Sequence, residues 1–377
     1  MKKSQYLLII FFIISISETG YSLPRFALSM GGQCADCHIN PTGGELRNKG
    51  GFHFEQNVLP MFSAHKIKMS DKIGDNIFFG LDYRTQYLYS QQIKRSDFQK
   101  MNASIYTDVN LTDKLDIYGM YDFINQFWEA YGVAHILPNG SYIKAGTYSP
   151  NYGIRLDDHT AYTRGGDLAY ITNSSYGLIY QPGFTETGIE IGAYLSSFAF
   201  LTASVGNPHA GYSVKDPAIF TDDPSFTASL QLTPVIANKI PLLIGGSYST
   251  FKGRIGSYIP KPYSKVNMYG GFLGFGIGNF TLLGEYDFAK DIIINNATAN
   301  ALMVQGAFQI IQGLEAVVRY DKFDPNNKVS NNELSRWIIG FEFYPYNFIE
   351  IRPQYRIQNE TPAIDNNSFV LQFHFYY

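Results

Sequence analysis

Apolar and polar residues alternate along most of the chain after residue 76. In the first such stretch one parity is apolar and the other is small or polar: Ile77, Phe79, Leu81, Tyr83, Tyr87 and Tyr89 against Gly80, Asp82, Arg84, Gln86 and Ser90. A period of two predicts β-strands with two unlike faces. Strands of about ten residues with one apolar and one polar face are typical of transmembrane β-barrels.

Seventeen segments of the chain fit such strands. They lie near residues 77–90, 101–111, 115–123, 128–137, 141–149, 175–182, 187–196, 198–206, 225–233, 241–251, 265–277, 279–289, 299–311, 314–323, 335–344, 347–357 and 367–377. Because single-chain bacterial barrels normally have an even strand number, we predict an all-β fold with an antiparallel barrel of about sixteen strands. The barrel is expected to cover residues 73–377.

The end of the sequence carries the same pattern in aromatic form. Its apolar residues are spaced by two: Phe369, Leu371, Phe373, Phe375 and Tyr377. This spacing resembles the terminal strand of outer-membrane barrels. A soluble β-sandwich would also alternate, but it leaves the aromatic residues of the outer parity unexplained. Aromatic residues make up 16% of the chain and charged residues also 16%, against about 25% charged residues in soluble proteins.

The first residues predict export. Lys2 and Lys3 precede an apolar run over 6–16, and small residues follow at Gly20 and Ser22. This order is typical of a signal peptide, here residues 1–22 with cleavage after Ser22. The alternative is a retained anchor, although a spanning helix needs roughly twenty apolar residues. A net charge of −3 offers no basic patch for nucleic acid.

The only two cysteines stand in the motif Cys34-Ala35-Asp36-Cys37-His38. This spacing is the attachment pattern of c-type haem. We predict that Cys34 and Cys37 form thioethers with one haem c and that His38 is the proximal iron ligand. Two alternatives remain: a disulfide or redox pair, and a zinc site completed by His53 and His65.

The sequence leaves the distal iron ligand open. We select His53, because it follows Gly50-Gly51 and lies far enough past His38 for the chain to wrap the ring. The other candidates are Met30, Met61, His65, Met69, His135, His159 and His209.

The residues around the motif resemble a known family. Ser29-Met30-Gly31-Gly32-Gln33 precedes it, Asn40-Pro41-Thr42-Gly43-Gly44-Glu45-Leu46-Arg47-Asn48 and Gly50-Gly51-Phe52 follow it, and a barrel comes next. This order resembles the fused monohaem cytochrome-porins, of which the best known serve iron oxidation in bacteria. The resemblance implies a monohaem cytochrome segment over residues 23–72. The Asn-Pro-Thr-Gly-Gly element differs from the iron oxidisers' residues after the haem histidine.

Size suggests where that segment lies. Forty-odd residues rarely fold alone, and a barrel of about sixteen strands leaves a lumen. We therefore expect residues 23–70 to plug its periplasmic half.

A set of charged and polar side chains lies between two predicted strands, in residues 151–166: Arg155, Asp157, Asp158, His159 and Arg164. It is either an inward loop that constricts the pore or binds a cation or haem propionate, or an ordinary solvated loop.

Three functions fit these features. The first is electron transfer in the outer membrane, in contact with lipid, between an extracellular redox donor or acceptor and a soluble periplasmic electron carrier. The second is a diffusion porin with a structural or sensory haem. The third is a haem enzyme, which needs an open iron position.

Overall fold

The computed structural model describes residues 24–44, 46–63, 69–156, 158, 160–166, 177–178, 185–209, 224–253, 264–292, 296–360 and 363–377. The predicted signal peptide, residues 1–22, lies outside the described residues, as do His65, Asp157 and His159.

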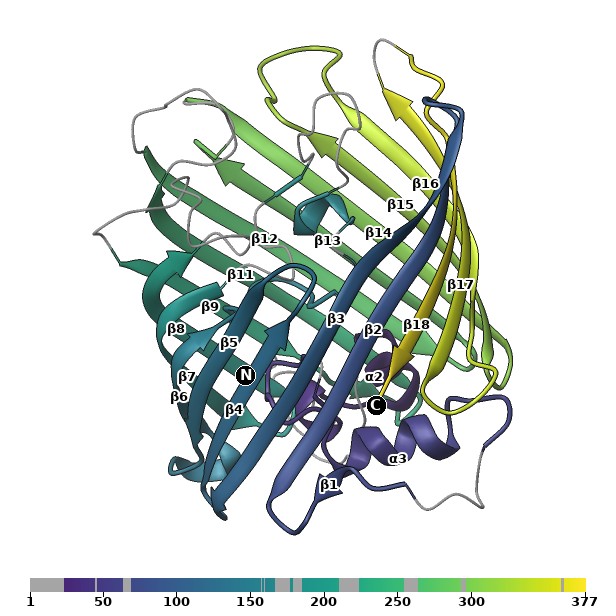
Figure 1. Ribbon diagram of the computed structural model, residues 1–377. Helices are drawn as coiled ribbons and strands as arrows, with labels where there is room; N and C mark the ends of the chain where they lie inside the picture. The colour runs from purple at the N-terminus through teal and green to yellow at the C-terminus, as the bar shows by residue number, and fades with distance from the viewer. Residues whose placement is uncertain are drawn as a thin grey trace, which may run out of the picture.

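Most of the described chain forms one antiparallel sheet (Figure 1). Its first half holds β2 (Ile77–Ser90), β3 (Arg95–Thr112), β4 (Leu115–Asp122), β5 (Phe127–Ala134), β6 (Tyr142–Tyr148), β7 (Thr185–Ser196), β8 (Ala199–His209) and β9 (Ser225–Leu232). Its second half holds β11 (Ile240–Gly253), β12 (Ser264–Ile277), β13 (Phe280–Lys290), β14 (Thr298–Ile311), β15 (Leu314–Asp324), β16 (Leu334–Phe343), β17 (Ile349–Glu360) and β18 (Ser368–Tyr376). Two-residue strands β1 (Lys72–Ile73) and β10 (Val235–Ile236) pair with β2 and β11.

The sheet closes on itself. Each long strand pairs with its neighbours in the chain, and β18 pairs with β2, with Phe375 opposite Tyr83. The predicted sixteen-stranded barrel is therefore confirmed. The strand expected near 175–182 is wrong at the residues described there, because Gly177 and Leu178 belong to no strand. Leu178 is buried inside the barrel, so its apolar character reflects packing in the lumen.

Alternation along the strands separates an apolar exterior from a mixed interior. In β16, Trp337, Ile339 and Phe341 are 45%, 48% and 47% exposed, whereas Arg336 and Ile338 between them are buried. Paired strands satisfy their backbone groups within the sheet, which a membrane interior requires. An apolar band on a closed barrel is the surface that faces lipid. No helix in the described ranges is long and apolar enough to cross a membrane.

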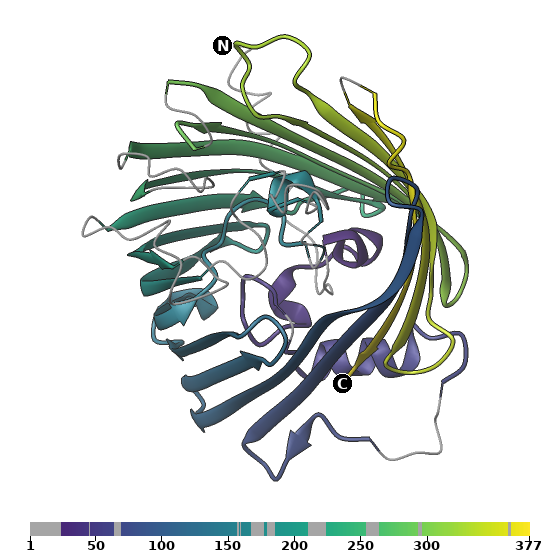
Figure 2. The same ribbon diagram turned by 45° about the horizontal axis from the view of Figure 1, so that its top comes forward.

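The two ends of the barrel differ. At one end β3–β4, β12–β13 and β14–β15 are joined by the two-residue turns 113–114, 278–279 and 312–313. At the other end the connections are longer, as in 149–184 and 210–224. Short turns face the periplasm in bacterial barrels. Within the described residues, three helices precede the barrel strands and lie at this end (Figures 1 and 2): α2 (Pro24–Met30), the 3-10 helix η1 (Cys34–Asp36) and α3 (Lys49–Asn57).

Candidate functional site

Helix α2 docks on the barrel wall where the wall has no side chains. A Cβ on Gly276 of β12 would lie 2.2 Å from the carbonyl oxygen of Leu28, and one on Gly274 would lie 2.7 Å from Leu28 Cδ1. Glycine is therefore required at these positions for the helix to approach this closely. Arg25 of the same helix forms ion pairs with Glu342 and, at 3.3 Å, with Glu315.

The segment after the motif crosses the seam where the barrel closes. A Cβ on Gly80 of β2 would lie 2.9 Å from Leu46 Cδ1. The guanidinium of Arg47 stacks over the ring of Tyr376 in β18, 4.7 Å from its centroid. The N-terminal segment thus contacts both strands of the seam.

The motif itself forms one tight turn. The backbone N–H groups of Cys37 and His38 donate to the carbonyl oxygen of Cys34, at 3.2 and 3.0 Å. The backbone N–H of Gln33 donates to the Asp36 carboxylate at 2.8 Å and fixes the start of the turn. This turn brings Cys34, Cys37 and His38 to the lining of one cavity.

Asn48 and two glycines hold α3 against this turn. The Asn48 side chain accepts hydrogen bonds from the N–H groups of Gly50 and Gly51, and it donates to the carbonyl oxygen of Ala35 at 2.9 Å. It is therefore both the N-cap of α3 and a brace for the motif. A Cβ on Gly51 would lie 2.3 Å from the Cys37 carbonyl oxygen, and one on Gly50 would lie 2.3 Å from that of Asp36.

Burial sets the protonation states of the motif. It lowers the pKa of His38 to about 3, and the charges of Arg47 and Arg155 act in the same direction. The imidazole is therefore neutral, which is the form that binds metal. Its Nδ1 is buried and has no hydrogen-bond partner among the described residues. Burial also raises the pKa of the Cys34 thiol to about 11.

The cavity lies between the N-terminal segment and the barrel wall. Its empty volume, which includes open solvent, is about 2150 Å³. Cys34 carries a free thiol, so no disulfide joins the two cysteines of the chain. Within the described ranges no three His, Cys, Asp or Glu side chains gather into a metal site.

The structure does not bring the tentative distal ligand to this cavity. His53 lies on the exposed side of α3 and is absent from the cavity lining, so we do not retain it as a ligand. Helical geometry is the reason, because Phe52, Phe54 and Glu55 take the buried faces of α3.

Four other sequence candidates that the structure describes also lie outside the cavity lining. Met30 is 39% exposed, and His135 pairs with Asp116 at 3.5 Å. Met61 and Met69 are half-buried outside the lining. His209 ends β8, and its side chain is outside the described part of the structure.

Two barrel residues in the lining carry ligand-type side chains that the sequence alone did not single out, Met120 of β4 and His374 of β18. Both ring nitrogens of His374 already have partners: Nδ1 lies 3.0 Å from Glu350 and Nε2 lies 2.9 Å from Asp82. Met120 packs in an apolar cluster that includes Leu46. The even-numbered residues of β4 face the lumen, so the alternation in the sequence could have placed Met120 there.

The polar loop over 151–166 folds into the barrel. Arg164 pairs with Glu285 at 2.7 Å, and Asp158 pairs with Arg319 at 2.6 Å. The backbone N–H of Gly153 donates to Ser247 at 2.9 Å. These contacts reach β11, β13 and β15, so the loop is tied to the wall and is not merely solvated.

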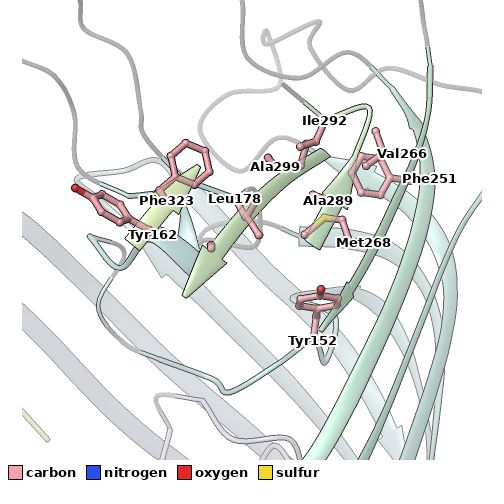
Figure 3. Close-up of a cluster of buried hydrophobic side chains, with 11 residues drawn as sticks. Tyr152, Tyr162, Leu178, Phe251, Val266, Met268, Ala289, Ile292, Ala299 and Phe323 are labelled. Carbon is pink, nitrogen blue, oxygen red and sulfur yellow. The ribbon is translucent and has the colours of Figure 1, made fainter. Parts of the chain in front are cut away.

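An apolar cluster packs the same loop against the wall (Figure 3). The loop and the residues after it contribute Tyr152, Tyr162 and Leu178, and the strands contribute Phe251, Val266, Met268, Ala289, Ala299, Ala301 and Phe323. The N-terminal segment and this loop therefore both occupy the lumen, one beyond the other along the barrel.

The fold defines a class: a closed, sixteen-stranded antiparallel membrane barrel. Solved structures agree with this. OmpT of Vibrio cholerae matches with 12% identity over 82% of this chain and 100% of its own, at a TM-score of 0.54. The outer-membrane channel DcaP of Acinetobacter baumannii matches with 12% identity over 80% of this chain and 97% of its own, at a TM-score of 0.55.

A third solved structure, Salmonella typhi OmpF in complex with daunomycin, matches with 9% identity over 81% of this chain and 98% of its own, at a TM-score of 0.57. At these identities the likeness shows the fold. No family model matches the chain, and no curated protein matches it. The porin-type barrel and its apolar exterior assign the chain to the outer membrane and its lipid.

Proposed function

We propose that this barrel carries one covalent haem c in its lumen and passes electrons between an extracellular redox species and a soluble periplasmic carrier. The observation that supports this is the placement of Cys34, Cys37 and His38 in the lining of one cavity inside the barrel. Two thiols and an adjacent imidazole are what covalent haem attachment requires. When bound, the haem supplies one-electron chemistry.

The residues of the site fit such a group. Cys34 and Cys37 would hold it, and the neutral imidazole of His38 suits iron, because its buried Nδ1 has no partner in the described part of the chain. Asn48 and Gly51 keep the motif in its turn. The buried apolar side chains of Leu46, Phe54 and Met120 line the cavity and offer contacts to the faces of a ring.

The position of the site suggests on which side of the membrane each redox partner reaches it. The motif lies at the barrel end with short turns, which faces the periplasm in this class, so the soluble carrier is expected there. One haem cannot span a hydrocarbon core of about 30 Å. The extracellular partner must therefore enter the lumen from the side of the long connections, or a second cofactor must take part.

A second candidate function is a diffusion porin in which the haem is structural or sensory. The likeness to outer-membrane channels favours it. In this reading the same attachment occurs, but solutes cross the lumen and no electron needs to leave the site.

The first experiment tests attachment. The mature protein, produced with the haem-attachment machinery, is expected to carry one haem by mass and by the absorbance of its pyridine complex. Replacing Cys34 and Cys37 together with Ala should abolish it, whereas His53→Ala, on the exposed side of α3, should not. A wild-type chain without haem would overturn the proposal.

The second experiment separates the candidates. Purified protein in liposomes is given an external reductant and a trapped acceptor. Electron conduction predicts reduction that is lost when the two cysteines are replaced by Ala. A diffusion porin predicts sugar flux that this double variant does not change. A six-coordinate, low-spin iron spectrum would argue against a haem enzyme.

A further inference from the structure

One arginine in the cavity has no carboxylate partner among the described residues, although the other arginines of the lining each have one. Seven arginines line it within the described ranges: Arg25, Arg47, Arg84, Arg155, Arg164, Arg319 and Arg352. Six of them pair with a carboxylate: Arg25 with Glu342, Arg47 with Glu55, Arg84 with Asp82, Arg164 with Glu285, Arg319 with Asp158 and Arg352 with Glu350. Among the described residues, Arg155 donates only to neutral oxygens, Gly43 O at 2.7 Å and Thr42 Oγ1 at 3.2 Å.

This unpaired guanidinium lies beside the attachment motif. A Cβ on Gly43 would lie 3.6 Å from Arg155 Cδ and also 3.6 Å from Cys34 Sγ. Gly43 has a φ of +87° and Gly44 one of +140°. Positive φ favours glycine, so the turn after the motif presents bare backbone to Arg155. The Arg155 side chain and the Cys34 thiol thus both lie next to Gly43.

The loop fixes Arg155 in this place. On one side, the Gly153 N–H donates to Ser247 at 2.9 Å and the Ile154 N–H to Glu285 at 3.2 Å. On the other side, Asp158 pairs with Arg319 at 2.6 Å. Anchors on both sides hold the guanidinium over the motif before any ligand binds. Preorganised donors bind an anion with less loss of entropy.

We propose that Arg155 binds a propionate carboxylate of the haem and so positions the free edge of the cofactor. This inference rests on the proposed function. Haem carries two carboxylates, and a planar guanidinium pairs with a carboxylate through two parallel hydrogen bonds. Such a partner supplies Arg155 with the anion that each of the other six lining arginines finds in the protein. Arg155 is a positioning residue that links the inward loop to the N-terminal segment.

The experiment compares Arg155→Gln, Arg155→Lys and the remote control Lys328→Gln in the full, haem-loaded protein. Lys328 lies in the connection between β15 and β16. The readouts are the midpoint potential and the propionate bending mode in the resonance Raman spectrum. Arg155→Gln removes a positive charge beside the haem, so the potential should fall and the bending mode should shift. Arg155→Lys keeps the charge and should retain most of the potential but lose the wild-type bending mode.

Each result decides the proposal. If Arg155→Gln loads haem and keeps the wild-type potential and bending mode, the proposal is wrong. If Arg155→Gln fails to load haem, the test rests on Arg155→Lys. A propionate bending mode in Arg155→Lys at the wild-type position would then overturn the proposal. A wild-type chain without haem would instead refute the proposed function, since the Arg155 variants are read only on a loaded wild type.

Discussion

Gly51 is the residue on which the contact between α3 and the motif depends most directly. Its missing side chain lets the Cys37 carbonyl come within 2.3 Å of where a Cβ would be. Overpacking of this kind costs about 1–3 kcal/mol. We expect Gly51→Ala in the haem-free protein to push α3 from the motif and to speed alkylation of Cys34 and Cys37 by a thiol reagent.

The matched control for that variant is Gly119→Ala in β4. There the nearest atom to a new Cβ is Thr107 Cγ2 at 3.8 Å, which is ordinary contact. Alkylation in Gly119→Ala should match that of the wild type. Equal rates in both variants would mean that the helix does not depend on close approach at Gly51.

Glu55 makes the site sensitive to pH. Burial raises the pKa of Glu55 to about 7, although Arg47 opposes this. As the pH rises through this value the carboxyl loses its proton and adds a negative charge beside the cavity. That charge favours oxidised iron, so the midpoint potential of the haem-loaded protein should fall as the pH rises through about 7.

The stability of the fold should also fall as the pH rises. Because burial raises the pKa of Glu55 from 4.5 to about 7, the protonated carboxyl stabilises the fold fully below pH 4.5, and this contribution is lost as the pH rises through about 7. Glu55→Gln should flatten the dependence of the potential on pH. Glu333→Gln, an exposed carboxyl in the connection between β15 and β16, should leave it in place. A potential that changes with pH as much in Glu55→Gln as in the wild type contradicts this assignment.

At the scale of elements, the inward loop depends on the buried pair between Arg164 and Glu285. Both side chains are almost fully buried, and removing one partner of such a pair costs about 3–5 kcal/mol. We expect Arg164→Gln to release the loop and to expose it to chymotrypsin. Cleavage after Tyr152, Leu156 or Tyr162, followed by mass spectrometry, measures the effect.

The exposed pair between Lys322 and Glu333 provides the comparison. Its side chains are 38% and 50% exposed, and surface pairs contribute about 0–1 kcal/mol. Lys322→Gln should therefore be cleaved as slowly as the wild type. If Arg164→Gln is equally resistant, the loop is held by the apolar cluster and not by the ion pair.

The strands were predictable and the internal segments much less so. Alternation around Ile339 assigns its strand and its outward face from local sequence alone. His53 lies on the exposed side of α3, and the sequence could not show this because a distance in residues says nothing about direction on a helix. The partners of Arg164 and Asp158 lie more than a hundred residues away in the sequence, at Glu285 and Arg319. Such pairs depend on how the barrel closes, which no local pattern contains.

At the scale of the whole molecule, the position of a residue relative to lipid decides the cost of a charge. Ile339 lies in the middle of β16 and is 48% exposed, and Val329 is 51% exposed in a connection beyond the strands. Lysine on the lipid face costs about 2–4 kcal/mol at the bilayer midplane and about 0–1 near its surface. Ile339→Lys should lower the urea midpoint in liposomes, and Val329→Lys should not.

Equal urea midpoints for those two variants would contradict the orientation of the barrel in the bilayer.

Sequence alone could predict the lipid-facing surface, because the alternation that turns every second residue outward is a local property of each strand. It could also predict that Cys34, Cys37 and His38 belong together. It could not predict that Arg155 lies beside them, since that contact joins two segments more than a hundred residues apart through the lumen.

The contacts of Leu46 and Arg47 with both strands of the barrel seam impose an order on biogenesis. The segment that bears the motif leaves the ribosome and enters the periplasm before β18 does. Its docking surface exists only once β18 has joined β2. For the proposed haem we therefore expect a limited interval for loading, during which the segment is still accessible to the attachment machinery. Cells that assemble the barrel faster than they attach haem would accumulate a closed, empty protein.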